Sequence, residues 1–158
     1  LLLTAFLANA QAFTGKGDDK FQVGANFQDR ATGIMATYDH GIGENMSIGL
    51  YTTYLLDTSN YSNTTFDSKF EDRFDVKARF SANIGNVMGL PEQVDIYPGL
   101  NLGLRNFGGH LGARYFFTNG FGVFTELNVP IAKYDNDVIG YEHLNNQFTV
   151  SLGASFNL

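Results

Sequence analysis

Five charged residues alternate with mostly apolar residues along segment 70–84 of this 158-residue chain: Glu71, Arg73, Asp75, Lys77 and Arg79. On an extended strand such alternate side chains share one face, where carboxylates and cations can form ion pairs. Other segments with the same alternation supply five further charges, at Asp39, Asp95, Arg105, Arg114 and Glu126. Five cations against five carboxylates predict a neutral, paired network that fills a narrow interior. A narrow proton or ion path through the same charges is the alternative.

The other reactive residues do not form a known catalytic or metal-binding pattern. Three histidines, His40, His110 and His143, are widely spaced, and neither a His-Glu-x-x-His sequence nor a carboxylate-rich calcium loop occurs. The chain has no cysteine, which excludes disulfides, thiolate metal sites and a cysteine nucleophile. Some β-barrel enzymes that modify lipids use a histidine together with a serine or a carboxylate. Glu142 and His143 are adjacent in this sequence, but nothing positions a serine nucleophile near them. We therefore expect no catalysis, no metal and no cofactor.

Composition narrows the class of protein. Charged residues make up 16% of the chain, hydrophobic residues 44% and aromatic residues 15%, which is unlike the composition of a disordered protein. No run of 18 apolar residues is present that could span a bilayer as a helix. The net charge of -6 argues against binding to nucleic acid, which requires a basic surface.

The first twelve residues differ from the rest of the chain. An apolar run from Leu1 to Ala8 is followed by small residues at the spacing of a secretory cleavage site, which ends at Ala12. We interpret residues 1–12 as the remnant of a secretory signal peptide that is cleaved before Phe13, and residues 13–158 as the mature domain. A short buried strand or helix is the alternative interpretation of the apolar run.

Alternation of apolar and polar residues continues through the rest of the chain and predicts an all-β fold. Eight strands are expected, at about residues 20–28, 32–40, 46–56, 70–84, 94–105, 107–117, 121–132 and 147–157. In most of them one face is rich in Leu, Val and Phe, whereas the other carries polar residues interleaved with glycine. Segment 70–84 is longer than a typical strand of a soluble protein.

The composition of the two faces indicates which of them points inward. Small and polar residues suit a cramped interior, and bulky apolar residues suit a convex surface against lipid. The strand lengths also match the roughly 9–11 residues of a tilted strand that crosses a bilayer. We therefore expect an eight-stranded antiparallel up-and-down transmembrane β-barrel with an apolar outer surface and a polar lumen filled by side chains.

An even number of strands brings both ends of the barrel domain to one side of the membrane, which is the periplasmic side in bacterial barrels. Connections 41–45, 85–93 and 118–120 then lie on that side, and the longer loops 57–69 and 133–146 lie on the other. Aromatic side chains near strand ends are expected to form two girdles, at Tyr38, Phe117, Phe121 and Phe156 on the periplasmic side and at Tyr54, Phe74, Phe107 and Phe148 outside.

The last nine residues, Val150 to Leu158, alternate in polarity and place Phe156 and Leu158 on one face. This segment resembles the C-terminal strand that the barrel-assembly machinery recognises, although the family pattern prefers an aromatic residue in the last position. From Phe13 to Leu158 the chain resembles the small eight-stranded outer-membrane barrels of Gram-negative bacteria. More narrowly, segments 17–27 and 76–80 are similar to an uncharacterised flavobacterial outer-membrane barrel family. The resemblance implies the fold and a location in the outer membrane, and it implies no activity.

The expected role is structural or anchoring, with the protein as an accessory subunit of a larger envelope complex. Its expected partners are outer-membrane lipid, the barrel-assembly machinery and other outer-membrane proteins, and no nucleic acid. Two alternatives remain open. The barrel could be a surface-binding, adhesin-like protein that acts through loops 57–69 and 133–146. It could also be a soluble, calycin-like carrier, which would require the apolar face to point inward around an apolar ligand.

Overall fold

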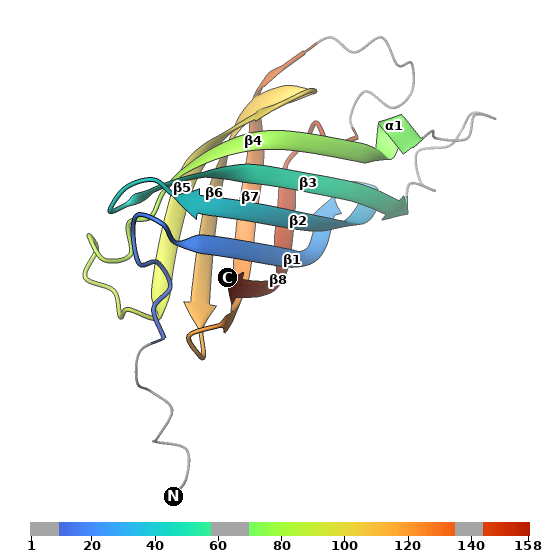
Figure 1. Cartoon of the computed structure of the whole chain (residues 1–158). Helices are drawn as coiled ribbons and strands as arrows, with labels where there is room; N and C mark the ends of the chain where they lie inside the picture. Colours follow the sequence, from blue (N-terminus) through green and yellow to red (C-terminus); the bar gives the residue numbers. More distant parts are fainter. Residues whose placement is uncertain (1–9, 58–69, 135–143) are drawn as a thin grey trace, which may run out of the picture.

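The computed structural model of the chain describes residues 10–57, 70–134 and 144–158. These residues form a closed antiparallel barrel in which eight strands follow one another in chain order (Figure 1). The strands are β1 (Asp19–Gln28), β2 (Ala31–Gly41), β3 (Met46–Asp57), β4 (Phe74–Ala82), β5 (Val94–Gly103), β6 (Asn106–Phe116), β7 (Phe121–Lys133) and β8 (Thr149–Asn157). The described part of the chain has no helix that is long and apolar enough to cross a membrane.

The barrel closes where β8 returns to β1. Their pairing runs from Lys20 opposite Asn157 to Gln28 opposite Thr149, so the first and last strands have no free edge along this seam. The eight-stranded, antiparallel, up-and-down topology predicted from the alternation is therefore confirmed. Closure lets neighbouring strands satisfy each other's backbone hydrogen-bonding groups along the paired segments of the wall.

Side chains alternate between a buried interior and an exposed outer surface along the strands. In β3, for example, Leu50 is 54% exposed and Tyr51 is 2% exposed. In β4, Phe80 is 40% exposed and Arg79 is 3% exposed. The polar face therefore points inward and the apolar face outward, as the sequence predicted. The soluble-carrier alternative required the opposite orientation, and the buried position of Arg79 contradicts it.

Strand β4 is shorter than predicted, because the expected strand 70–84 begins only at Phe74 and ends at Ala82. Residues Phe70–Arg73 instead form one helical turn, α1. A helical turn brings residues four apart onto the same side, and the rings of Phe70 and Phe74 stack at a centroid distance of 5.7 Å. Phe70 also packs against Tyr54 of β3, at 5.4 Å. These aromatic contacts favour the turn over continuation of the strand.

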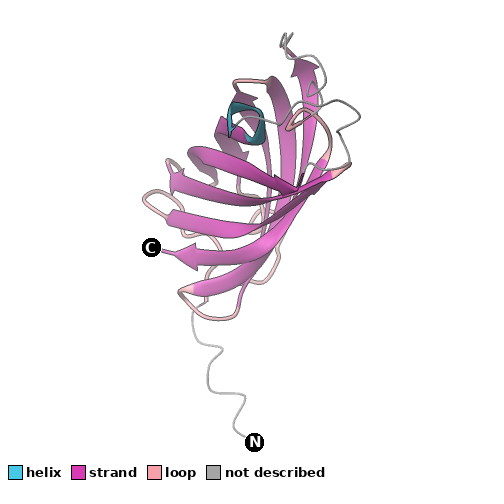
Figure 2. Cartoon of the chain, turned by 90° about the vertical axis from the view of Figure 1, so that its right-hand side faces the viewer, coloured by secondary structure: helices cyan, strands magenta, loops and turns pink. Residues whose placement is uncertain are grey.

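The two ends of the barrel differ. At one end, here called the terminal end, β1 begins and β8 ends, and connections 42–45, 83–93 and 117–120 join neighbouring strands. At the other end, here called the loop end, residues 29–30 and 104–105 form tight turns. The two remaining connections contain residues 58–69 and 135–143, which lie outside the described ranges. Figure 2 shows the strands side by side around the barrel, with α1 at the loop end.

Aromatic rings cluster at the outer surface near both ends. At the terminal end, Phe121 lies between Phe117 and Phe156, at centroid distances of 6.1 and 5.6 Å. At the loop end, the stack of Tyr54, Phe70 and Phe74 occupies the corresponding position. The outer surface between the two clusters is apolar, with exposed leucine, valine and isoleucine side chains from β2, β3 and β5–β8.

Candidate functional site: the polar lumen

Arg79 of β4 forms ion pairs with two carboxylates in the lumen. Its Nη2 atom lies 2.8 Å from Oε2 of Glu126 on β7, and both side chains are completely buried. Its Nε atom lies 3.2 Å from Oδ1 of Asp39 on β2. These three strands are separated in the barrel wall by other strands, so the guanidinium cross-links distant parts of the wall through the interior. A buried arginine with two carboxylate partners avoids the desolvation cost of an unpaired charge.

A chain of hydrogen bonds leads from Glu126 to the far wall, and its direction follows from the chemistry of its members. The carboxylate accepts from Nδ2 of Asn128 (3.0 Å), whose Oδ1 accepts from Nδ2 of Asn101 (2.7 Å). Oδ1 of Asn101 is then left to accept from Nδ1 of His110 (2.8 Å). This assigns the imidazole proton to Nδ1, so Nε2 accepts from the hydroxyl of Ser81 (2.9 Å).

The Ser81, His110 and Asn101 side chains thus have the connectivity of a serine–histidine–amide relay. All three side chains are buried, with exposed fractions of 1% for Ser81, 5% for His110 and 2% for Asn101. The Ser81 hydroxyl is therefore closed to a substrate in this conformation. We interpret the relay as a polar cross-brace between β4, β5 and β6.

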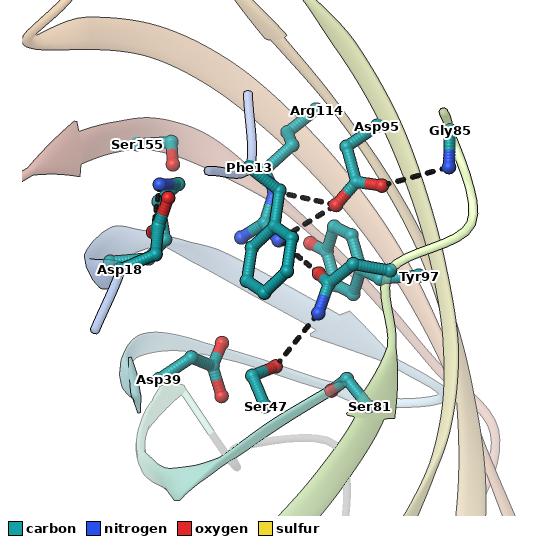
Figure 3. A network of polar contacts seen from close by, with 12 residues as sticks. Phe13, Asp18, Asp39, Ser47, Ser81, Gly85, Asp95, Tyr97, Arg114 and Ser155 are labelled. Carbon is teal, nitrogen blue, oxygen red and sulfur yellow. Dashed lines mark hydrogen bonds and ion pairs between the residues drawn. The ribbon is translucent and has the colours of Figure 1, made fainter. Parts of the chain in front are cut away.

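A second cluster lies at the terminal end of the lumen (Figure 3). Arg114 of β6 donates from Nη2 (2.8 Å) and Nε (3.2 Å) to Oδ2 of Asp95 on β5, and also donates to Asn83. The other oxygen of Asp95 accepts from the backbone N–H of Gly85 (3.1 Å). The Arg114 guanidinium lies 4.5 Å from the centroid of the Tyr97 ring, which is a cation–π contact.

Residues 10–18 lie beside this cluster and cover the terminal end of the lumen. The Phe13 ring lies beside Arg114, and Asp18 forms a buried ion pair with Lys20, the second residue of β1. Ala10 and Ala12 pack against Phe116 inside the barrel. The sequence assigns residues 1–12 to a signal peptide, of which residues 1–9 lie outside the described ranges. Cleavage before Phe13 stays a prediction.

A third cluster closes the loop end. Lys77 of β4 lies 3.6 Å from Asp75 and donates to Oδ1 of Asn106 (3.2 Å). Asn106 in turn donates to the backbone carbonyl of Asn145 and to Oδ1 of Asn146, each at 3.0 Å. Residues 144–146 are all buried and therefore fold over the end of the lumen. An apolar contact of Leu144 with Ala31 and Leu55 seals the same end.

Seven of the ten charged residues predicted for the lumen are buried there: Asp39, Asp75, Lys77, Arg79, Asp95, Arg114 and Glu126. Arg105 was expected on a strand but lies half-buried in the β5–β6 turn, because β5 ends at Gly103. It is still close enough to Asp75 to interact electrostatically. Glu71 and Arg73 belong to α1 and not to β4. Arg73 is half-buried at the loop end, and the Glu71 side chain is outside what the structure describes.

Several lumen residues were not identified from the sequence. Lys20 and its partner Asp18 were assigned to a strand end or linker, because the fold of residues 10–18 back into the barrel has no sequence pattern of its own. Met35, Phe116 and Phe124 are also buried inside. Their positions could have been found, because each shares the strand face of a polar residue two positions away: Thr37, Arg114 and Glu126 respectively.

The remaining site predictions fall in different places. Within the described ranges, no three His, Asp or Glu side chains come together in a way that could hold a metal ion. Glu142 and His143 lie outside the described ranges, as do most of loops 57–69 and 133–146. Phe156 is half-buried and packs against Phe21, and Leu158 is 77% exposed at the terminal end. Their role in barrel assembly stays a prediction.

Comparison with known proteins agrees with this architecture. The chain belongs to a family of unknown function, DUF6646, with a match over residues 3–158. No curated protein matches the chain. A solved structure described as "De novo design of transmembrane beta-barrels" is similar, with a TM-score of 0.54 and 10% sequence identity over 92% of this chain and 98% of that chain.

At that level of identity the similarity shows the fold alone. The fold expected from the resemblance to small transmembrane barrels is confirmed. This chain forms a closed eight-stranded antiparallel barrel, and a designed transmembrane barrel has a similar structure. The family description names no organism, so the resemblance to a flavobacterial family stays a prediction.

Proposed function

We propose that the protein is a structural, non-catalytic anchor in the bacterial outer membrane, with its lumen sealed and its chain ends on the periplasmic side. The observation that carries this proposal is the combination of an apolar outer surface with the buried Arg79–Glu126–Asp39 ion pairs. An apolar exterior of this kind is suited to lipid. Charged side chains that cross-link the interior occupy space that an aqueous path would need, because a barrel of eight strands has an interior only wide enough for side chains.

The dimensions of the barrel support a membrane location. Its strands contain 9 to 13 residues, a range that includes the length needed for a tilted strand to cross the hydrocarbon core. The aromatic clusters around Phe121 and Phe74 lie near opposite ends of the strands, where aromatic girdles meet the two lipid–water interfaces.

The connections support the proposed orientation. Bacterial barrels have short periplasmic turns and longer external loops. The turn 117–120 lies at the terminal end, whereas the connections that include residues 58–69 and 135–143 lie at the loop end. The terminal end is therefore the better match to the periplasmic side.

The absence of cysteine from the sequence allows a clean test of orientation. Single cysteines at Arg30 in the loop-end turn and at Asn119 in the terminal-end turn would be treated on intact cells with a membrane-impermeant maleimide. Labelling of Arg30→Cys but not of Asn119→Cys before cell lysis is the expected result. The reverse pattern would refute the orientation, and equal labelling of both would refute the membrane topology.

Planar-bilayer conductance tests the sealed lumen. The purified barrel should add no channel current above leak, because the lumen is closed by buried ion pairs and by both end clusters. An anchoring subunit should also extract from membranes in mild detergent together with other envelope proteins. Reproducible open-channel currents would contradict the sealed lumen, and extraction only as a lone monomer would contradict the accessory-subunit role.

A further inference from the structure

The terminal mouth of the barrel holds an element that does not belong to the barrel wall. Residues 13–18, which we call the plug segment, enter the mouth before β1 begins at Asp19. The Phe13 ring lies 5.9 Å from Nζ of Lys20 and 6.0 Å from Cζ of Arg114. The Asp18 carboxylate pairs with Lys20. The plug segment thus presents one aromatic ring and one carboxylate to the two cations of the mouth.

The backbone of the plug segment is attached to the end of β2. Gly17 donates its N–H to the carbonyl of Gly41 (2.7 Å), and Gly41 donates to the carbonyl of Asp18 (2.7 Å). This close approach requires glycine at position 41, because a Cβ there would overlap the carbonyl oxygen of Gly15. Gly41 lies in regular β2 backbone without a positive φ, so alanine fits the strand but not the docked plug segment.

The plug segment fills the mouth incompletely. A cavity of about 220 Å³ lies between it and the ends of β1 and β8, lined by Thr14, Asp18, Lys20 and Asn157 among others. A smaller cavity of about 60 Å³ lies on its other side, next to Phe13, Asn83 and Asp95. The mouth therefore has space beside the plug segment that neither the segment nor the barrel wall fills.

Release of the plug segment would change the charge of the mouth. Lys20 would lose its partner Asp18, whereas Arg114 would keep Asp95. Both cations would also lose the face of the Phe13 ring. An open mouth would therefore leave Lys20 without its close ion-pair partner, although Asp95 and Asp39 still interact with it electrostatically. An extended chain with a carboxylate and an aromatic side chain would restore the lost contacts.

We propose that the terminal mouth is a binding site for an extended peptide of an envelope partner that carries an aromatic residue and a carboxylate, and that the plug segment occupies this site in the free protein. The proposal rests on the accessory-subunit role and names the chemistry by which a partner would be recognised. Since the plug segment competes in cis, it lowers the apparent affinity for such a peptide by the fraction of mouths that are open.

The test uses the full chain with Gly41→Ala, which displaces the plug segment and leaves Lys20 and Arg114 unchanged. Gly43→Ala in the adjacent turn is the matched control, because its Cβ would meet only the flexible side chain of Met46. The probe is a fluorescein-labelled peptide with the sequence of residues 10–19, and its anisotropy is measured against each detergent-solubilised barrel. We expect the probe to bind the Gly41→Ala barrel at least about tenfold more tightly than the unmodified or Gly43→Ala barrels.

A second peptide, with Phe13→Ala and Asp18→Asn, tests the proposed chemistry and should bind at least about tenfold more weakly. Equal binding of the probe to all three barrels, or equal binding of both peptides to the Gly41→Ala barrel, would overturn the proposal. If Gly41→Ala fails to give the heat-modifiable migration of a folded barrel, Phe13→Ala in the full chain replaces it. Heat-modifiable migration and bilayer insertion test the proposed membrane anchor, whereas peptide binding tests the proposed site in the mouth. Failure of one proposal can therefore be distinguished from failure of the other.

Discussion

The ring of Tyr97 lies directly against the backbone of Gly112 on the neighbouring strand. Tyr97 is completely buried, and a Cβ at position 112 would overlap its ring. The Tyr97 ring also lies close to positive charge, since the guanidinium groups of Arg114 and Arg79 lie 4.5 and 5.7 Å from the ring centroid. Glycine in β6 thus makes room for the large side chain that contacts two arginines in the lumen.

Replacement of Gly112 by alanine should destabilise the barrel because the Tyr97 ring has no space to retreat. Overpacking of this kind typically costs about 1–3 kcal/mol in the free energy of unfolding. Urea titration of the barrel in detergent, followed by heat-modifiable migration, measures the change. Gly120→Ala is the control, because a Cβ in that turn would contact nothing. Equal midpoints for the two variants would show that Tyr97 is not tightly confined.

The ion pair between Arg79 and Glu126 should show strong energetic coupling. Glu126→Leu leaves a buried guanidinium with Asp39 as its remaining ion-pair partner, at a cost of about 3–5 kcal/mol in stability. The double variant Arg79→Met with Glu126→Leu should be destabilised by clearly less than the sum of the two single variants.

A double-mutant cycle from urea unfolding supplies that comparison. Lys133→Met, at the exposed end of β7, is the control for loss of a cation outside the lumen and should change stability by less than about 0.5 kcal/mol. Additive effects of Arg79→Met and Glu126→Leu would mean that the two side chains do not interact in the folded barrel.

The outer surface should reject charge if it faces lipid. Leu111, in the middle of β6, is 50% exposed on that surface. Leu111→Arg should destabilise the barrel in vesicles by about 2–4 kcal/mol, the typical cost of arginine near the bilayer midplane. The same substitution at Asn119, which is exposed in a terminal-end turn, should have little effect. If Leu111→Arg is as stable as Asn119→Arg, the surface around Leu111 is not in contact with lipid.

The seam between β4 and β5 should be the most dynamic part of the wall. Its register extends only from Lys77 opposite Gly103 to Ser81 opposite Gly99, so residues 74–76 have no partner in β5. The N–H of Val76 bonds to Oδ1 of Asp75 (3.0 Å). Amide hydrogen exchange should therefore be faster for residues 74–76 than for residues 34–36 of β2, which are paired on both sides. Similar protection of the two segments would contradict this expectation.

The barrel itself could be predicted from the sequence because its determinants are local. Alternation along β7 assigns Glu126 to the interior and Leu127 to the exterior, and the same rule holds on every strand. The rule failed at Arg73, where stacking of Phe70 on Phe74 converts the strand end into a helical turn. Alternation alone does not include such side-chain contacts.

The plug segment could not be predicted for a different reason. Its docking depends on pairing between residues far apart in the sequence, such as Phe13 with Arg114. Such a contact leaves no periodic signal, and the sequence therefore places Lys20 only at a strand end, although its side chain is buried in the lumen with 1% exposed. Alternation predicts which face of a strand a charged residue occupies. It does not predict the partner of that charge, which depends on the strands that the closed barrel brings together.

A single introduced tryptophan can report whether the apolar outer surface contacts lipid, because the chain contains no tryptophan of its own. Leu50→Trp places a single reporter on the outer surface of β3, where the native side chain is 54% exposed. In vesicles of lipid brominated in the middle of the acyl chains, we expect blue-shifted emission and strong quenching, whereas Asn119→Trp in the terminal-end turn should remain unquenched. Red-shifted, unquenched emission from Leu50→Trp in the folded barrel would contradict a lipid-facing surface, because the apolar surface would then face water.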